Sequence, residues 1–242
     1  MKKSFAVLLV LILLLTVPLS GLASLKRGDK GNEVKQMQQL LSDLGFLNDK
    51  VDGDFGKNTE AAVKELQKYW GLEQTGVFQD YDMETLTRLR KIATGEYEYG
   101  PLSPQEKEEY GVYCSWIVDE DGYQKVELCY RHYAQFMPAL MLESGPAPHK
   151  LEKLLVQQIC NFWLKDIEEM YTEWEDQLEE KEKNIVREQK KLFDQSLAEN
   201  RKTWEKLNTK DDPNQGLKQE MIWLEQMGVE LCFDMHGAEV NP

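Results

Sequence analysis

Apolar side chains recur at steps of three and four residues in three short stretches of the first third of the chain. Such a period places them along one face of a helix. Glycines follow the first two stretches at Gly45 and Gly71, a position where many helices end. The pattern therefore predicts a small three-helix unit, with helices over residues 34–44, 58–70 and 82–89.

The second half of the chain has a longer apolar repeat. Between His149 and Asp212 the sequence contains no glycine or proline, and apolar residues recur mostly at steps of four. This pattern predicts long amphipathic helices. The repeat lapses over residues 179–184, where either the chain turns in a helical hairpin or one helix runs through. A further apolar repeat over residues 221–231 predicts a last helix.

Two short runs with strand-like composition, residues 113–118 and 123–130, lie between the helical regions. An acidic turn that contains Gly122 separates them. Two such runs around a tight turn are typical of a β-hairpin, in which Cys114 and Cys129 could pair across the strands. Irregular helix is the alternative interpretation of the same residues.

Charge divides the chain into two parts. Residues 24–94 carry 11 basic and 12 acidic side chains, whereas residues 95–242 carry 16 basic and 31 acidic ones, a net charge of −15. Residues 95–104, rich in glycine and proline, are typical of a linker. We therefore expect a mainly α protein in which a small three-helix domain, residues 24–94, precedes an acidic, mostly helical domain, residues 105–242.

The acidic excess limits the partners that suit the second domain. Its net negative charge repels nucleic acid and anionic lipid at long range and attracts basic proteins or cations. A solvated surface that serves only solubility is the alternative. We expect no nucleic-acid partner.

The first 23 residues have the three parts of a secretory signal. Lys2 and Lys3 form the basic start, residues 5–17 are almost wholly apolar, and small residues lie at the exit around Ala23. The apolar run is shorter than the roughly 20 residues that a spanning helix needs. We therefore expect cleavage after Ala23 rather than an uncleaved anchor, which predicts a secreted or extracytoplasmic protein without a stable membrane anchor.

Four cysteines lie in the acidic part and none lies in residues 24–94. An even number in an exported domain suggests two disulfides, with three possible pairings, and free thiols are the alternative. A bridge between Cys160 and Cys232 would tie the first long helix to the last. No CxxC spacing is present, so we expect no metal site and no cofactor. The candidate disulfide residues are Cys114, Cys129, Cys160 and Cys232.

The first domain resembles a known family when its residues are taken in order. The matching positions are Leu25, Gly28, Asp29, Gly31, Val34, Gln38, Leu41, Leu44, Gly45, Phe46, Val51, Asp52, Gly53, Phe55, Gly56, Thr59, Ala62, Val63, Gln67, Gly71, Leu72 and Gly76. This set resembles the peptidoglycan-binding domain found attached to many cell-wall hydrolases and spore-cortex enzymes. One departure is Asp82, which stands where the family usually caps its last helix with threonine. The resemblance implies a three-helix fold at the bacterial cell wall, with glycan strands or stem peptides of peptidoglycan as ligands.

Side chains suited to such a ligand lie on the polar turns and at the end of the second helix. Carboxylates and amides suit hydrogen bonds to amide or hydroxyl groups, and aromatic rings suit packing against a sugar face. The alternative is structural, with the aspartates bonded to turn backbone and Phe55 in the core. The candidate ligand-binding residues are Asp29, Asp52, Asp54, Phe55, Asn58, Tyr69 and Trp70.

The acidic part carries a second resemblance, over residues 160–232. Its positions are Tyr171, Leu178, Gln189 and Phe193, inside a charged, cysteine-bounded helical pair, and they are similar to those of the LprI-type lysozyme-inhibitor domain. Glu188 replaces an alanine of that family, and Phe193 is displaced by one position from its tryptophan. The resemblance implies a basic protein partner such as a lysozyme, which an acidic surface would attract.

The sequence offers no catalytic motif. The histidines are His132, His149 and His236, and none lies in an HxxE, HxxxD or Cys–Gly–His grouping. Acidic residues are so abundant that a carboxylate pair for glycan cleavage carries no signal. We therefore expect a non-catalytic protein that places an acidic interaction domain at the cell wall. A lysozyme inhibitor and a wall hydrolase of unrecognised type are the alternatives.

Overall fold

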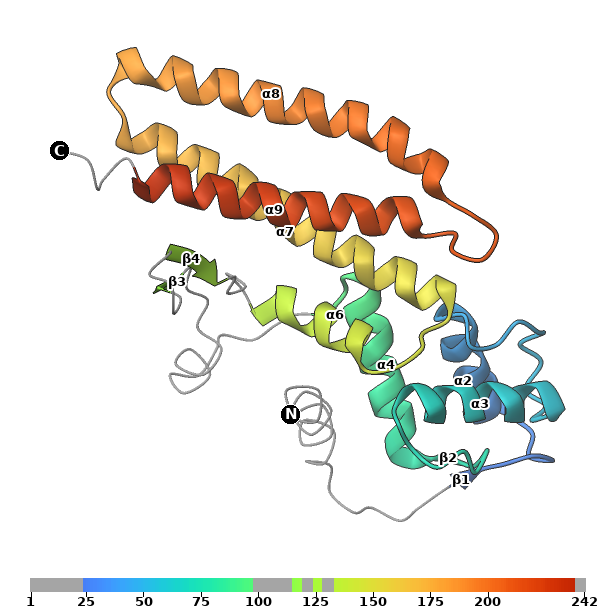
Figure 1. Cartoon of the computed structure of the whole chain (residues 1–242). Coiled ribbons are helices and arrows are strands. Elements are labelled where there is room, and N and C mark those ends of the chain that lie inside the picture. Colours follow the sequence, from blue (N-terminus) through green and yellow to red (C-terminus); the bar gives the residue numbers. More distant parts are fainter. Residues whose placement is uncertain (1–23, 98–114, 119–123, 128–132, 238–242) are drawn as a thin grey trace. The chain divides into compact units, whose positions relative to one another are not determined.

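The computed structural model divides the chain into two compact units and is mainly helical, as predicted (Figure 1). The first unit comprises residues 1–98 and 137–155, and the second comprises residues 99–136 and 156–242. The predicted signal and most of the predicted linker fall outside the described residues. The structure describes residues 24–97, 115–118, 124–127 and 133–237.

Three helices form the centre of the first unit, which confirms the prediction from the apolar repeat. They are α2 (Asn32–Asp43), α3 (Lys57–Tyr69) and α4 (Asp80–Thr94). Two short strands, β1 (Ser24–Leu25) and β2 (Phe78–Gln79), pair antiparallel and hold the start of the domain against the entry to α4.

Each of these helices buries one apolar face. Burial of a leucine- or valine-sized side chain contributes about 1.5–3 kcal/mol relative to exposure. Gly45 and Gly71 follow the first two helices with φ of 85° and 71°, values that favour glycine, and the chain reverses there. Side chains at the centre of this core are Val34, Met37, Leu41, Ala62, Val63, Leu66, Leu86, Leu89 and Ile92.

The first unit also contains residues 137–155, beyond the predicted domain boundary at residue 94. These residues form the last part of α6 (Tyr133–Glu143) and the start of α7 (His149–Gln177). The Tyr69 hydroxyl donates a hydrogen bond of 2.5 Å to the carbonyl oxygen of Met141. Lys150 Nζ donates another, of 2.8 Å, to the carbonyl oxygen of Ser42. This later segment therefore completes the packing at the carboxyl ends of α2 and α3.

Three long helices dominate the second unit. They are α7 from Val156 onward, α8 (Glu180–Trp204) and α9 (Gln215–Gly237), with a short 3₁₀ turn, η1 (Glu205–Leu207), after α8. The chain leaves α7 at Gln177 and enters α8 at Glu180, so the lapse in the apolar repeat is a hairpin and not a continuous helix. Figure 1 shows α8 and α9 in orange and red.

The strand-like runs are a β-hairpin, the first of the two interpretations that the sequence left open. Strand β3 (Ser115–Val118) pairs antiparallel with β4 (Gln124–Glu127), and Trp116 lies opposite Val126. The turn between these strands falls outside the described residues. Cys114 and Cys129 do so too, and their predicted pairing stays a prediction.

The helices of the second unit are joined by aromatic contacts and ion pairs. The Tyr171 ring of α7 lies 6.1 Å from that of Phe193 in α8, and Phe193 stacks on Trp223 of α9 at 5.3 Å. Lys190 Nζ reaches Glu168 Oε2 at 2.8 Å, which adds a pair between α7 and α8. These contacts hold α8 beside both neighbours.

Cys160 is a buried free thiol, so the Cys160–Cys232 bridge, one of the pairings that the sequence left open, does not form. Its Sγ contacts the carbonyl oxygen of Leu217, near the start of α9, at 4.0 Å. Cys232 lies 15 residues further along the same helix, about 22 Å away at 1.5 Å per residue. A disulfide spans only about 7 Å between Cα atoms. Burial raises the pKa of the Cys160 thiol to about 12, which keeps it protonated at neutral pH.

Candidate functional site

Two loops of the first unit are joined by backbone hydrogen bonds. Residues 26–31 precede α2, and residues 49–58 comprise the loop before α3 together with the first two residues of that helix. We call these two segments the loop pair. The Phe55 amide donates to the Asp29 carbonyl at 2.9 Å, and the Gly31 amide donates to the Gly53 carbonyl at 2.9 Å. The turns around Gly53 are therefore one half of an ordered polar surface.

The buried side chain of Gln38, on α2, holds the loop pair in place through hydrogen bonds. Its Nε2 donates to Thr59 Oγ1 at 3.1 Å and to the Asp54 carbonyl at 3.0 Å. It also lies 3.2 Å from Asp52 Oδ1, and its Oε1 accepts the Gly53 amide at 2.8 Å. One amide thus satisfies a buried turn that would otherwise leave polar groups without partners.

The exposed side of the loop pair carries several charged and amide side chains. Asp54 Oδ2 accepts a hydrogen bond of 2.6 Å from Lys30 Nζ. Asn58 Nδ2 donates one of 2.6 Å to Asp49 Oδ2. Asp52 Oδ1 also accepts the amide of Asp54 at 2.9 Å. The surface therefore offers both hydrogen-bond donors and acceptors in fixed positions.

Hydrogen bonds lower the pKa of two carboxylates of this surface, Asp49 and Asp52. The Asn58 amide, followed by the Lys50 backbone amide, lowers the pKa of Asp49. The Asp54 backbone amide and then the Gln38 side chain lower the pKa of Asp52. Carboxyl groups with a lowered pKa suit the acceptance of hydrogen bonds from a ligand and do not suit proton donation.

Two of the predicted ligand contacts are wrong, because Phe55 and Tyr69 are core residues with exposed fractions of 1% and 0%. Burial raises the pKa of the Tyr69 hydroxyl above its usual range, in keeping with its bond to the Met141 carbonyl. Trp70 is half-buried at the far end of α3, about 18 Å along the helix from Asn58. The structure therefore brings Asp29, Asp52, Asp54 and Asn58 to one surface and leaves the aromatic candidates elsewhere.

Asp82 stands at the position of the family's capping threonine, but it is not the capping residue of α4. The helix begins at Asp80, so Gln79 is the capping residue and Asp82 is the third residue of the helix. Asp82 Oδ2 accepts the Gln79 amide at 2.6 Å, which closes a capping box. Burial of this carboxyl raises its pKa to about 6.

Sequence reasoning assigned no site role to Gln38 and Asp49, the two residues that organise the loop pair. Gln38 stands among Val34, Met37 and Leu41 on the buried face of α2. A glutamine inside an apolar repeat signals a buried amide with specific partners. Asp49 carries no comparable signal, because its partner Asn58 is brought near only by the turns between them.

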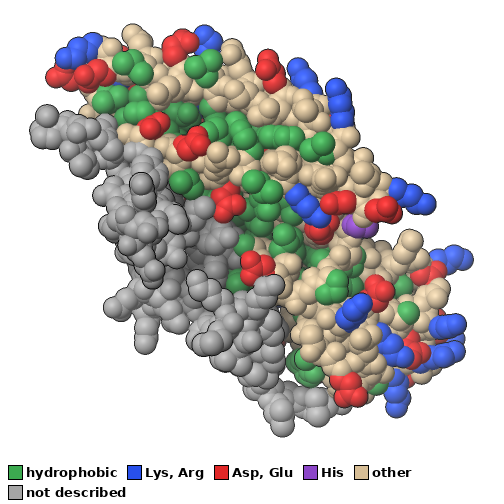
Figure 2. Space-filling view, in the orientation of Figure 1, with side chains coloured by type: hydrophobic (Ala, Val, Ile, Leu, Met, Phe, Trp, Pro, Cys, Tyr) green, Lys and Arg blue, Asp and Glu red, His purple; other side chains and the backbone are tan. Residues whose placement is uncertain are grey.

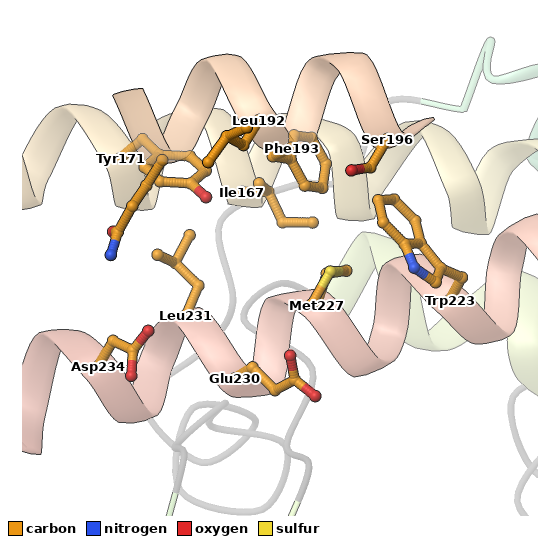
Figure 3. A pocket seen from close by; sticks show the side chains of 11 residues that line it. Ile167, Tyr171, Leu192, Phe193, Ser196, Trp223, Met227, Glu230, Leu231 and Asp234 are labelled. Atoms are coloured by element: carbon orange, nitrogen blue, oxygen red, sulfur yellow. The ribbon is translucent and has the colours of Figure 1, made fainter. Parts of the chain in front are cut away.

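The second unit has a groove of about 270 Å³ between α7, α8 and α9 (Figure 3). Three of its lining residues, Tyr171, Gln189 and Phe193, are positions of the LprI-type resemblance, whereas Leu178 does not line it. Figure 3 shows Tyr171 and Phe193 facing Leu231 and Trp223 of α9 across the groove.

Two kinds of site were not found within the described ranges. No cluster of three or more His, Cys, Asp or Glu side chains there could hold a metal ion. In the same residues, every helix is too short or too polar to cross a membrane.

The first unit is thus a small helical domain with a preformed polar surface on two loops. Residues 30–89 match the family model described as "Putative peptidoglycan binding domain". The match takes in α2, α3, the second loop and most of α4. This segment of the chain belongs to the peptidoglycan-binding domain family, which confirms the resemblance seen in the sequence.

Two curated proteins are similar to short stretches of the chain. The "Putative OxPP cycle protein OpcA" of Nostoc punctiforme is 42% identical over 59 residues, which cover 24% of this chain and 12% of that protein. The "Spore cortex-lytic enzyme" of Halalkalibacterium halodurans is 38% identical over 53 residues, which cover 22% and 16%. The chain therefore spans less than a fifth of either relative. No solved structure matches the chain.

Proposed function

We propose that this protein binds peptidoglycan through its first unit and acts outside the cytoplasm at the cell wall. The observation that carries the proposal is the family match over residues 30–89, which includes most of the loop pair and the helices that hold it. The similarity to a spore cortex-lytic enzyme supports the same location.

The loop pair is the surface that suits the ligand. Asp54, Asn58 and Lys30 are exposed and already oriented by hydrogen bonds. Glycan hydroxyls and peptide amides both donate and accept hydrogen bonds, so such a surface can pair with either. Because the buried Gln38 fixes the backbone behind it, little ordering is needed when the ligand binds.

A sedimentation assay with purified sacculi tests this proposal on the full chain. We expect the protein to pellet with the sacculi, and D54A combined with N58A to lower the bound fraction several-fold. A matched control is E65A, since Glu65 is exposed on α3 outside the loop pair. No retention of the unsubstituted protein at low and moderate salt would contradict the proposal.

We also propose that the protein is not itself a hydrolase and that its second unit is an interaction domain. In the loop pair, the pKa values of Asp49 and Asp52 are lowered, which is opposite to what a general acid requires. Asp82 has a raised pKa, but its carboxyl is buried at the start of α4 and engaged by the helix cap. Zymography on embedded cell walls tests this point, and a lytic band from the pure protein would refute it.

Lysozyme inhibition is a second candidate function for the second unit. It is favoured by the convergence of Tyr171 of α7 with Gln189 and Phe193 of α8 on one groove. Addition of the protein should then slow lysis of cell walls by a lysozyme in a turbidity assay. Unchanged rates with several lysozymes would remove this candidate.

A further inference from the structure

Aromatic rings line the groove between α7, α8 and α9. Phe193 and Trp223 stack with ring centres 5.3 Å apart and planes inclined by 17°. Tyr171 continues the row on one side at 6.1 Å from Phe193, and Trp204 does so on the other at 5.7 Å from Trp223. Faces of aromatic rings attract both apolar groups and cations.

Apolar side chains are also exposed along the edge of the groove. Leu192 lines it and is 60% exposed, and Ile185, two turns earlier on α8, is 62% exposed. Figure 2 shows apolar side chains in a band along the region of α8 and α9, with acidic side chains beside them. Exposed apolar side chains beside an apolar groove commonly mark a binding site.

Carboxylates outnumber cations around the groove. Glu230 and Asp234 lie one turn apart on α9, line the groove and are exposed (Figure 3). Asp194 lies nearby on α8, and Lys190 is bonded to both Asp194 and Glu168. The groove thus combines an apolar lining with a net negative edge.

We propose that this groove binds a short segment of a basic polypeptide. An apolar side chain of the segment rests on Phe193 and Trp223, and lysine or arginine side chains beside it pair with Glu230 and Asp234. The proposal specifies a partner class for the interaction role proposed for the second unit, and it does not depend on peptidoglycan binding by the first.

The size and charge of the groove select this occupant. A volume of about 270 Å³ lies below the usual range of about 300–1,000 Å³ for drug-sized ligands, so it suits one or two side chains of a longer chain. The net charge of −15 over residues 95–242 draws basic partners toward it. Acidic polypeptides would meet repulsion from Glu230 and Asp234.

The test uses a fluorescein-labelled 12-residue peptide of leucine and lysine as the probe for the full-length protein. Fluorescence anisotropy should show binding that weakens as salt rises, because the charge pairs are exposed. Two matched peptides separate the apolar contribution from the charge contribution to binding. One has serine in place of leucine, and the other has glutamate in place of lysine. Both should bind at least about tenfold more weakly, since each lacks one half of the recognition.

Substitutions locate the binding. E230Q combined with D234N should weaken the leucine–lysine peptide about tenfold, and L192S should weaken it several-fold without disturbing the core, since Leu192 is exposed. The matched control is E199Q combined with E205Q, which removes the same charge from exposed positions that do not line the groove. Equal weakening by control and groove pairs would show non-specific attraction and overturn the proposal.

Two further outcomes would overturn it. Equal affinity of the serine–lysine peptide would mean that the groove takes no apolar side chain. Self-association measured by analytical ultracentrifugation and abolished by L192S would identify a second copy as the occupant. Sacculus sedimentation of the groove variants should equal that of the unsubstituted protein, so failure of the groove proposal and failure of the wall-binding proposal are separable.

Discussion

The two units of this protein hold their surfaces in place by different means. In the first, buried amides bridge irregular loops: Gln38 bonds the loop pair, and Gln67 bonds the next turn through Thr75, Gly76 and Val77. In the second, regular helices contact one another through aromatic rings and exposed ion pairs. The loops of the first unit depend on a few specific hydrogen bonds. The helices of the second unit depend on an apolar seam, that is, apolar side chains repeated at helical spacing.

The two units therefore differ in how strongly their structure constrains the sequence. A glutamine that must reach a particular glycine amide constrains both residue type and spacing, so the pattern is specific in sequence. A seam of apolar residues at helical spacing is satisfied by many sequences. Single substitutions should therefore lower the free energy of unfolding by different amounts in the two units. Four substitutions test this expectation, and they follow from the largest expected effect to the smallest.

The largest effect is expected for Q38L. Leucine removes every hydrogen bond of the buried amide and leaves the Gly53 amide and the Thr59 hydroxyl without this partner. At about 1–3 kcal/mol for each buried group left unsatisfied, the free energy of unfolding should fall by about 4 kcal/mol. Urea unfolding monitored by circular dichroism measures this change.

Q67L is the matched comparison for Q38L. Gln67 also bonds a glycine amide, that of Gly76 at 2.9 Å, but outside the loop pair. Q67L should also destabilise the first unit, yet the folded protein should still sediment with sacculi, whereas Q38L should not. Equal sacculus binding by both variants would show that the loop pair is not the binding surface.

The second prediction concerns the pH dependence that Asp82 gives to the first unit. Burial raises the pKa of this carboxyl from 3.8 to about 6, so the folded state holds its proton more tightly than the unfolded state does. The protonated Asp82 carboxyl therefore contributes its full stabilisation of the folded state below about pH 4, and this stabilisation is lost as the pH rises through about 6. With 1.36 kcal/mol per unit of pKa, the loss reaches about 3 kcal/mol by pH 7.

D82N should remove this loss, because an asparagine does not ionise. Between pH 4 and pH 7 the unfolding free energy of D82N should therefore rise relative to that of the unsubstituted protein. Asp49 and Asp52 have lowered pKa values and act in the opposite direction, since their contribution is lost as pH falls. Parallel pH profiles of the two proteins would contradict the role given to Asp82.

Local features of the fold could be predicted from the sequence, and contacts between distant segments could not. The helices of both units follow from apolar periodicity, and Gly45 and Gly71 mark real helix ends. The attachment of residues 137–155 to the first unit depends on contacts such as Tyr69 to Met141, which are 72 residues apart. No periodicity in either segment encodes that pairing.

The candidate site was predictable only in its polar part. Asp52 and Asp54 follow from turn chemistry, because aspartates beside glycines favour tight turns. Phe55 and Tyr69 were misassigned because the sequence does not show which side of a turn or helix end faces the core. The Cys160–Cys232 pairing failed for a related reason, since the direction of α9 brings its start, and not its end, to Cys160.

A smaller effect is expected in the second unit for G228A. A Cβ atom at Gly228 would lie 2.5 Å from Cζ3 of the buried Trp163 ring, so α9 or the indole must shift. Overpacking of this kind usually lowers stability by about 1–3 kcal/mol. Thermal unfolding should show the loss, and a double variant with a smaller side chain, W163L, should recover part of it. An additive loss in the double variant would contradict this contact as the cause.

The smallest effect on stability, and the sharpest test of the contrast between the units, is expected for K190Q. Lys190 is 31% exposed and bonds the exposed Glu168 and Asp194, and surface pairs of this kind contribute less than about 1 kcal/mol. Loss of its charge nevertheless leaves the groove edge more acidic, so the leucine–lysine peptide should bind about two- to threefold more tightly by anisotropy. The matched control K206Q removes a charge from η1, outside the groove lining, and should change neither quantity to a comparable extent. A marked loss of stability in K190Q would mean that exposed ion pairs, as well as the apolar seam, hold the second unit together.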